Sequence, residues 1–159
     1  MKPVMGRNFS MGPGCDLAAW PLMTRFDGGA RVLVPAEKGV VFGDNVTLGS
    51  MVTVNGGVKA PTRVGDDCFL WHGANIGHDC VLGRGVVVNV NAVLCGEVTV
   101  GDDTYIAPGA VVQPRCRIGR NVVIGTLANV IHDTVIPDNE VWYGNPARRR
   151  RENRWRKPE

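Results

Sequence analysis

A period of six residues runs through more than half of this chain and limits the folds it can adopt. From residue 64 to residue 142, every sixth position holds a large apolar residue. These positions are Val64, Leu70, Ile76, Leu82, Val88, Leu94, Val100, Ile106, Val112, Ile118, Ile124, Val130, Ile136 and Trp142. A helix turns once in about 3.6 residues and would scatter these side chains around its circumference. The pattern therefore predicts a short strand followed by a bend in every hexapeptide.

Such hexapeptides form a β-solenoid, in which each coil buries its large side chains only by stacking on its neighbours. The residue after the apolar position is often glycine, as at Gly65, Gly77 and Gly101, and we expect these glycines to supply backbone conformations that other residues resist. A β-sandwich would space its turns about 8 to 12 residues apart and would drift out of phase. The sequence thus favours an all-β fold, a parallel β-helix, with three hexapeptides to each coil.

The period also divides the chain. Residues 1–38 fit no repeat and are expected to form an irregular N-terminal cap over the end of the solenoid. Residues 39–147 form the β-helix domain. Within it, four extra residues enter around 55–61, and we expect them to leave one corner as a loop on the side of the active site. Residues 148–159 form a basic C-terminal tail, expected to be a short helix or disordered.

Composition narrows the classes of protein. No apolar run is long enough to span a membrane, and the N-terminus has no signal-peptide pattern, so a cytoplasmic protein without membrane association is expected. The five cysteines form no C-x-x-C pair, and small inward positions explain three of them, so neither a disulfide framework nor a metal site is expected. The formal net charge of +3 is concentrated in the tail, which is more typical of a solvated terminus than of a nucleic-acid-binding region.

Histidine is the natural candidate for acid–base chemistry, because an imidazole titrates near pH 6.5. The three histidines are His72, His78 and His132. Since Ile76 and Cys80 point inward in the repeat, His78 should face outward, with Asp79 beside it to orient or stabilise the ring. Spacing alone leaves open that His78 is an ordinary surface residue.

Several segments resemble one family. They are 51–55 (MVTVN), 62–67 (TRVGDD), 76–83 (IGHDCVLG), 91–100 (NAVLCGEVTV), 116–119 (CRIG) and 144–148 (GNPAR). Together they are similar to the left-handed β-helix acyltransferases of the hexapeptide-repeat family. Within it, they resemble the UDP-N-acetylglucosamine acyltransferases and the N-acetyltransferases of sialic-acid and bacillosamine synthesis. The resemblance supplies the left hand of the helix, since parallel crossovers are otherwise right-handed.

The resemblance implies catalytic roles for three residues. His78 would be the general base, Asp79 would support it, and the backbone N–H of Gly96 would stabilise the oxyanion of the tetrahedral intermediate. The spacing agrees with this assignment independently, because 18 residues are three hexapeptides. His78 and Gly96 should therefore stack on neighbouring coils, about 4.8 Å apart.

The resemblance also implies ligands and an assembly. It favours an enzyme that transfers an acetyl group from acetyl-CoA to the amino group of a sugar, with a nucleotide-linked sugar preferred, in a homotrimer with active sites between subunits. Ala107, Gly109, Gly125 and Arg148 are candidates for CoA contacts, and Asn75, Asn89 and Asn91 for sugar hydroxyls. No metal is needed.

Departures from the family keep alternatives open. Asn75, Glu97 and Gln113 stand where the lipid A enzyme has further histidines, and no long helical C-terminal region follows the repeat. A carrier-protein donor and O-acetylation are therefore alternatives. A γ-type carbonic anhydrase would need three histidines converging on zinc, whereas His72 and His78 should face different ways. A non-enzymatic trimeric scaffold would make the alignment of His78, Asp79 and Gly96 a coincidence.

Overall fold

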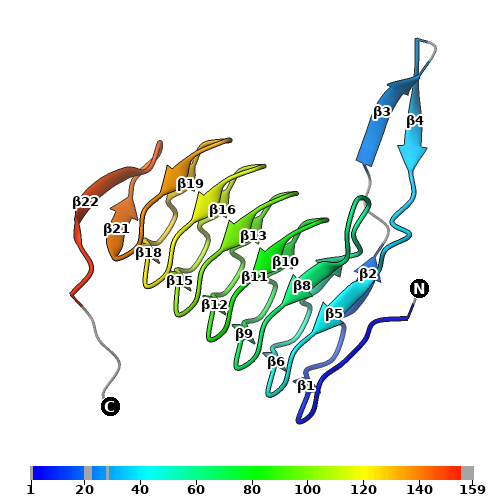
Figure 1. The fold of residues 1–159 in the computed structure, drawn as a ribbon, viewed down its shortest axis with the longest axis horizontal. Coiled ribbons are helices and arrows are strands. Elements are labelled where there is room, and N and C mark those ends of the chain that lie inside the picture. The colour runs from blue at the N-terminus through cyan, green and yellow to red at the C-terminus, as the bar shows by residue number, and fades with distance from the viewer. Residues whose placement is uncertain (1, 20–22, 28, 155–159) are drawn as a thin grey trace.

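The protein is a parallel β-helix of triangular cross-section. The computed structural model describes residues 2–19, 23–27 and 29–154. Its coils stack along one long axis (Figure 1), and a residue pairs with the residue 18 positions later, as Asn75 does with Val93. The all-β left-handed parallel β-helix predicted from the sequence is confirmed. No helix in the described residues is long and apolar enough to cross a membrane.

Three sheets form the sides of the triangle, and the chain visits them in the order A, B, C. Sheet A contains β5 (Val40–Phe42), β8 (Thr62–Val64), β11 (Val81–Leu82), β14 (Thr99–Val100), β17 (Arg117–Ile118) and β20 (Val135–Ile136). Sheet B contains β1 (Ser10–Met11), β6 (Thr47–Leu48), β9 (Phe69–Leu70), β12 (Val87–Val88), β15 (Tyr105–Ile106), β18 (Val123–Ile124), β21 (Glu140–Tyr143) and β22 (Arg148–Glu152). Sheet C contains β2 (Asp16–Ala19), β7 (Thr53–Asn55), β10 (Asn75–Ile76), β13 (Val93–Leu94), β16 (Val111–Val112) and β19 (Asn129–Val130).

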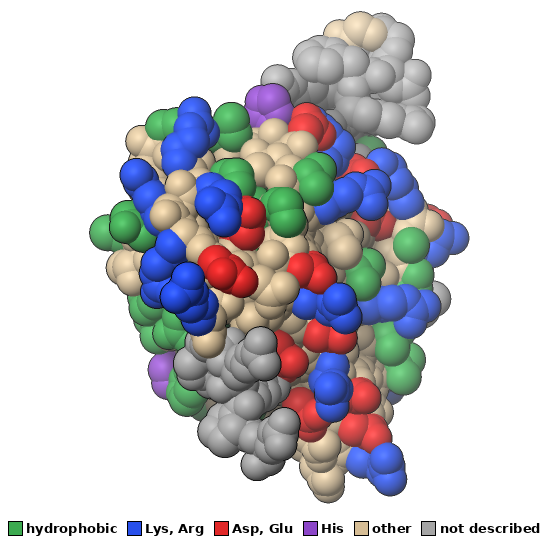
Figure 2. Space-filling model, turned by 60° about the vertical axis from the view of Figure 1, so that its left-hand side comes forward, with side chains coloured by type: hydrophobic (Ala, Val, Ile, Leu, Met, Phe, Trp, Pro, Cys, Tyr) green, Lys and Arg blue, Asp and Glu red, His purple; other side chains and the backbone are tan. Residues whose placement is uncertain are grey.

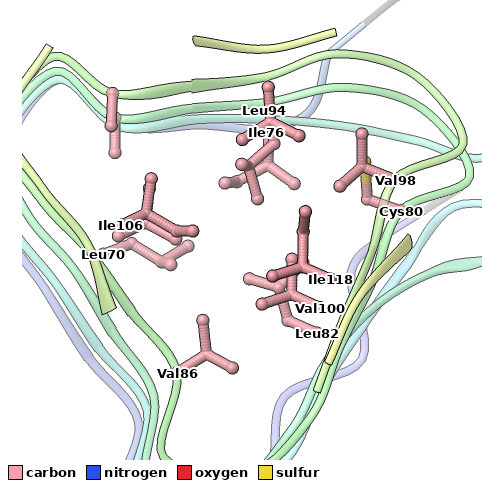
Figure 3. Packing of buried hydrophobic residues seen from close by; sticks show 14 of the residues in the cluster. Leu70, Ile76, Cys80, Leu82, Val86, Leu94, Val98, Val100, Ile106 and Ile118 are labelled. Carbon is pink, nitrogen blue, oxygen red and sulfur yellow. The ribbon is translucent and has the colours of Figure 1, made fainter. Parts of the chain in front are cut away.

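The core is the apolar column that the six-residue period predicts. Figure 3 shows its three walls, with Leu70 and Ile106 from sheet B, Ile76 and Leu94 from sheet C, and Leu82, Val100 and Ile118 from sheet A. Cys80 lies at the corner between sheets C and A, where its thiol donates to the carbonyl of Cys95 at 3.0 Å. Burial raises the pKa of that thiol to about 12, so Cys80 fills space and is not a nucleophile.

Replacing Leu94 with alanine should lower the free energy of unfolding by about 2 to 5 kcal/mol, because its side chain is fully buried and the stacked coils cannot close the cavity. Chemical denaturation of the variant measures this. Val81→Ala is the control, since Val81 points outward from β11 and is 40% exposed, and its stability should change by less than about 0.5 kcal/mol. Equal effects of the two substitutions would contradict the assignment of the core.

The glycines of the repeat have a different role from the one expected. Gly65, Gly77 and Gly101 do not have a positive φ, and Asp79 and Glu97 adopt that conformation instead. A Cβ on Gly77 would lie 2.6 Å from the carbonyl carbon of Cys95 on the next coil. These glycines are therefore required by the close approach of neighbouring backbones, and not by the turn itself.

The N-terminal region differs from the irregular cap expected for residues 1–38. Strands β1 and β2 pair in parallel with β6 and β7, so the first residues add a further coil to the solenoid. A hairpin of β3 (Met23–Asp27) and β4 (Ala30–Val34) is inserted between β2 and β5 and projects from the body in Figure 1. Because this insertion interrupts the coil, too few hexapeptides remain before it for the period to be visible.

The basic tail also differs from the expected short helix or disordered segment. Its described part, β22, pairs antiparallel with β21 and covers the edge of sheet B. The Arg149 guanidinium donates to Glu140 at 2.6 Å, and the Arg150 guanidinium lies 4.7 Å from the centre of the Tyr143 ring. On the face shown in Figure 2, Lys and Arg side chains alternate with Asp and Glu. That face is therefore not the single-sign patch that nucleic acid prefers.

Candidate active site

The centre of the candidate site is a histidine–aspartate pair at a corner of the solenoid. We name the corner between the strands of sheet C and those of sheet A the C–A corner, and His78 and Asp79 lie there between β10 and β11. His78 Nδ1 is 2.7 Å from Asp79 Oδ2. A proton on Nδ1 shared with the carboxylate leaves Nε2 as an acceptor, which is the state that a general base requires.

The loop expected around residues 55–61 packs against this pair. Asp79 Oδ1 accepts hydrogen bonds from the backbone amides of Val58, Lys59 and Ala60 at 3.0, 2.7 and 2.8 Å. The Asp79 amide in turn donates to the Thr62 hydroxyl at 2.9 Å. Asp79 therefore holds the loop with one carboxylate oxygen and His78 with the other.

These contacts keep the Asp79 carboxyl ionised. Its side chain is only 6% exposed, and this burial raises its pKa. The hydrogen bonds from the Ala60 amide, from His78 and from the Lys59 amide outweigh burial, so the pKa of Asp79 lies below its usual value. An ionised Asp79 favours the Nδ1 proton on His78 and stabilises the imidazolium that forms when Nε2 takes up a proton.

Gly96 lies one coil beyond His78, as the spacing of 18 residues predicted. The Glu97 amide donates to the His78 carbonyl at 2.8 Å, which fixes the two coils in register. A Cβ on Gly96 would lie 2.6 Å from Cε1 of the His78 ring. Only glycine therefore lets the imidazole lie against the backbone at this point.

The Gly96 N–H has no hydrogen-bond acceptor among the described residues. At the corner between sheets A and B, two amides in the same turn position donate to a side chain on the next coil, from Arg84 to Asp102 and from Arg120 to Asp138, both at 2.8 Å. The residue stacked on Gly96 is Pro114, which offers no such acceptor. The half-buried Gly96 N–H thus remains available, next to His78, for an oxygen atom that develops negative charge.

The other residues predicted for substrate and CoA do not all lie at this corner. Asn75, on β10, belongs to the same coil as His78 and is half-buried. The remaining glycine, alanine and asparagine candidates lie at the corner between sheets B and C, because each falls in a turn between a sheet B strand and the following sheet C strand, and these turns recur every 18 residues along the uninterrupted repeat. They are Asn89, Asn91, Ala107, Gly109 and Gly125. Asn89 donates to the Tyr105 hydroxyl at 2.7 Å.

Arg148 lies outside the turns of the C–A corner and of the corner between sheets B and C. It begins β22, and its guanidinium donates to the Ala147 carbonyl at 3.1 Å. Within a single chain, the structure therefore brings together His78, Asp79 and Gly96, with Asn75 on the same coil as His78, and places the other candidates elsewhere.

The histidines occupy different places. His72 is exposed at the B–C corner, where Nδ1 accepts from the Ser50 amide at 2.8 Å. His132 is at the C–A corner, but three coils beyond His78, which is roughly 14 Å at the strand spacing. It also pairs with an aspartate, since Nδ1 is 3.0 Å from Asp133 Oδ2. In the part of the chain that the structure describes, no three His, Cys, Asp or Glu residues are grouped to hold a metal ion.

Sequence reasoning missed one ion pair at the site. Lys59 Nζ from the loop is 2.7 Å from Glu97 Oε2, and Glu97 directly follows Gly96. The interruption of the period at residues 55–61 was a signal for the loop, but no periodic rule specifies the partner of a side chain on an insertion.

Comparison with known proteins supports the hexapeptide-repeat fold. Residues 61–96, 80–114 and 97–132 match the family described as bacterial transferase hexapeptide (six repeats). A Campylobacter concisus protein, acyl-[acyl-carrier-protein]–UDP-N-acetylglucosamine O-acyltransferase, is 32% identical over 65 residues, which is 39% of this chain and 25% of that protein. The chain thus spans about a quarter of this curated relative.

Solved structures extend the similarity of fold to nearly the whole chain. A UDP-N-acetylglucosamine acyltransferase from Bacteroides fragilis superposes with a TM-score of 0.84 at 25% identity, over 95% of this chain and 56% of that one. The perosamine N-acetyltransferase of Caulobacter crescentus, solved as a point mutant in complex with CoA and GDP-perosamine, gives a TM-score of 0.65 at 21% identity, over 94% and 58%. At 21% identity, the similarity to the perosamine N-acetyltransferase concerns the fold alone.

Proposed function

We propose that this chain, whose residues 61–132 carry the bacterial transferase hexapeptide repeat, is an acyltransferase that moves an acetyl group from acetyl-CoA to the amino group of a sugar. The observation that carries the proposal is the stack of the His78–Asp79 pair on Gly96. A base with a free acceptor nitrogen and a free amide one coil apart can bracket a single reacting carbonyl.

Each residue then has a step. The amine nitrogen of the acceptor attacks the thioester carbonyl, the C–N bond forms, and His78 Nε2 takes the proton that the nitrogen loses. The Gly96 N–H donates to the oxyanion of the tetrahedral intermediate. When the C–S bond breaks, the leaving CoA thiolate takes the proton from His78. Asp79 keeps its charge throughout and steadies the ring.

The separation of the two corners supports an assembly in which a neighbour completes the site. In one chain, Asn89, Asn91, Ala107, Gly109 and Gly125 lie away from His78, and a cyclic homotrimer would place the B–C corner of one copy against the C–A corner of the next. Met51, Trp71, Val90 and Leu127 expose apolar surface at the B–C corner, which such a contact would cover. Sedimentation of a species of about three times the chain mass tests this assembly.

Free-thiol release from acetyl-CoA, measured against a panel of amino sugars and their nucleotide derivatives, tests the function. We expect thiol release only with an acceptor that carries a primary amine, together with the N-acetylated product by mass spectrometry. Thiol release with the hydroxyl analogue of the same sugar would contradict N-acetylation. Absence of both turnover and CoA binding would contradict the proposed donor.

The curated relative favours one alternative donor. That protein is named for an acyl-carrier-protein substrate, and CoA and a carrier protein present the same phosphopantetheine thioester. Assaying acetylated carrier protein beside acetyl-CoA distinguishes the two, because the proposed donor should give the higher kcat/KM.

A further inference from the structure

Glu97 differs from the other carboxylates at the C–A corner. Three of its turns carry an acid at the same position, namely Asp79, Glu97 and Asp133. Asp79 is buried and accepts hydrogen bonds from His78 and from three loop amides. Asp133 accepts hydrogen bonds from Nε and Nη2 of the Arg115 guanidinium and is paired with His132. Among the described residues, the direct ion-pair partner of Glu97 is the flexible Lys59 ammonium, and the Arg115 guanidinium, which is itself paired with Asp133, also lies within the electrostatic range of Glu97.

Glu97 is also close to the reacting groups. It directly follows Gly96, and its own amide donates to the His78 carbonyl. Its side chain is 31% exposed, which leaves the carboxylate accessible from the outer surface of the corner. The candidate site therefore holds a negative charge, on Glu97, within one coil of the base His78. A substrate can reach this charge from the outer surface.

Lys59 can leave this carboxylate without disturbing the loop. Its side chain is 62% exposed, so the pair is solvated and weak. The loop backbone is held independently, through the bonds of the Val58, Lys59 and Ala60 amides to Asp79. The primary ammonium of Lys59 is thus bound to the Glu97 carboxylate in a place where another primary ammonium could replace it.

We propose that Glu97 is the acceptor-binding residue that recognises the ammonium group of the sugar, and that Lys59 occupies Glu97 when no acceptor is bound. This inference rests on the proposed function and makes it more specific. An alkyl amine is protonated near neutral pH, so it arrives as a cation and gains from a carboxylate, whereas a hydroxyl acceptor carries no charge. The ammonium loses one proton to water before attack, and His78 takes the second as the C–N bond forms.

The two members of the ion pair should have opposite effects on the Michaelis constant for the acceptor. Glu97→Gln should raise KM about tenfold or more, because the ammonium loses a charged partner. Lys59→Met should lower KM about two- to fivefold, because a competing cation is removed. Neither change should alter kcat by more than about threefold. If the Lys59–Glu97 pair only held the loop in place, both variants would instead bind the acceptor more weakly and raise KM. That result would overturn the inference.

Binding without turnover provides a readout that does not depend on acetyl transfer. Saturation-transfer NMR of glucosamine and glucose with the donor-free protein should show preferential binding of glucosamine, lost in Glu97→Gln and kept in Asp133→Asn, the matched carboxylate two coils away. Wild type binding the two sugars equally, or Glu97→Gln retaining the preference, would overturn the inference. If the preference depends on Glu97 but no acetyl transfer is found, the amine site stands and the proposed reaction fails.

Discussion

Replacing His78 with alanine should lower kcat/KM for acetyl transfer about 100- to 10,000-fold, the usual contribution of a positioned general base. The reason is local, since His78 supplies the one nitrogen that is both oriented by a buried carboxylate and placed against the Gly96 backbone. The fold should survive, because the ring lies outside the apolar column and its side chain is 19% exposed. Steady-state thiol release and a thermal unfolding scan measure the two quantities.

The chain offers a matched control for this substitution. His132 lies at the same corner, is also followed by an aspartate, and also directs Nδ1 at that carboxylate. It differs in its position, three coils away from the Gly96 amide. His132→Ala should therefore retain activity within about twofold of wild type. A similar loss in both variants, or a loss below tenfold in His78→Ala, would contradict the assignment of the base.

Substituting alanine for Gly96 should lower kcat about 100-fold while the N–H of residue 96 remains in place. The backbone conformation permits alanine, since Gly96 does not have a positive φ. The added methyl group, however, would overlap the His78 ring and push it outward. A displacement of about 1 Å at a reacting group typically costs about this much in rate. The imidazole is at the surface and can move, so the thermal stability should change little.

A double-mutant cycle separates the two possible effects of this substitution. If Gly96→Ala acts by displacing His78, it should add nothing to the loss already caused by His78→Ala. If the two losses multiply, the alanine also disturbs the Gly96 amide, and the ring is not the sole target. Gly77→Ala offers a contrast, because its methyl group would meet the backbone of Cys95, which cannot move aside, so stability should fall there.

Part of the site could be predicted from the repeat, because a solenoid converts spacing along the chain into position in space. His78 and Gly96 are one coil apart at the same corner for the same reason that Asn75 pairs with Val93. The period likewise separates His78 from Asn89 and Gly125, which 18-residue steps do not reach. The period does not show whether the corner between sheets B and C of a neighbouring copy lies against His78, because the residues of that corner would then belong to another chain.

The insertions are where sequence reasoning was least complete. The hairpin after β2 hides the fact that the first residues continue the ladder, with Leu17 paired to Val54 at a separation of 37 instead of 18. The extra residues at 55–61 are visible as a break in phase. The use of Asp79 to bind three of their amides is not visible, because it depends on where the loop folds back.

The sequence by itself determined the coil, the buried column, and the stacking of His78 beneath Gly96, because each follows from a strict period and from the burial of apolar side chains. Only the tertiary structure decided that the repeat glycines serve close backbone contact, that Pro114 leaves the Gly96 N–H free, and that Lys59 meets Glu97. These features arise between coils, where the position of one residue depends on atoms far away in the chain. Periodicity fixes which residues are neighbours, and side-chain contacts between those neighbours determine the chemistry.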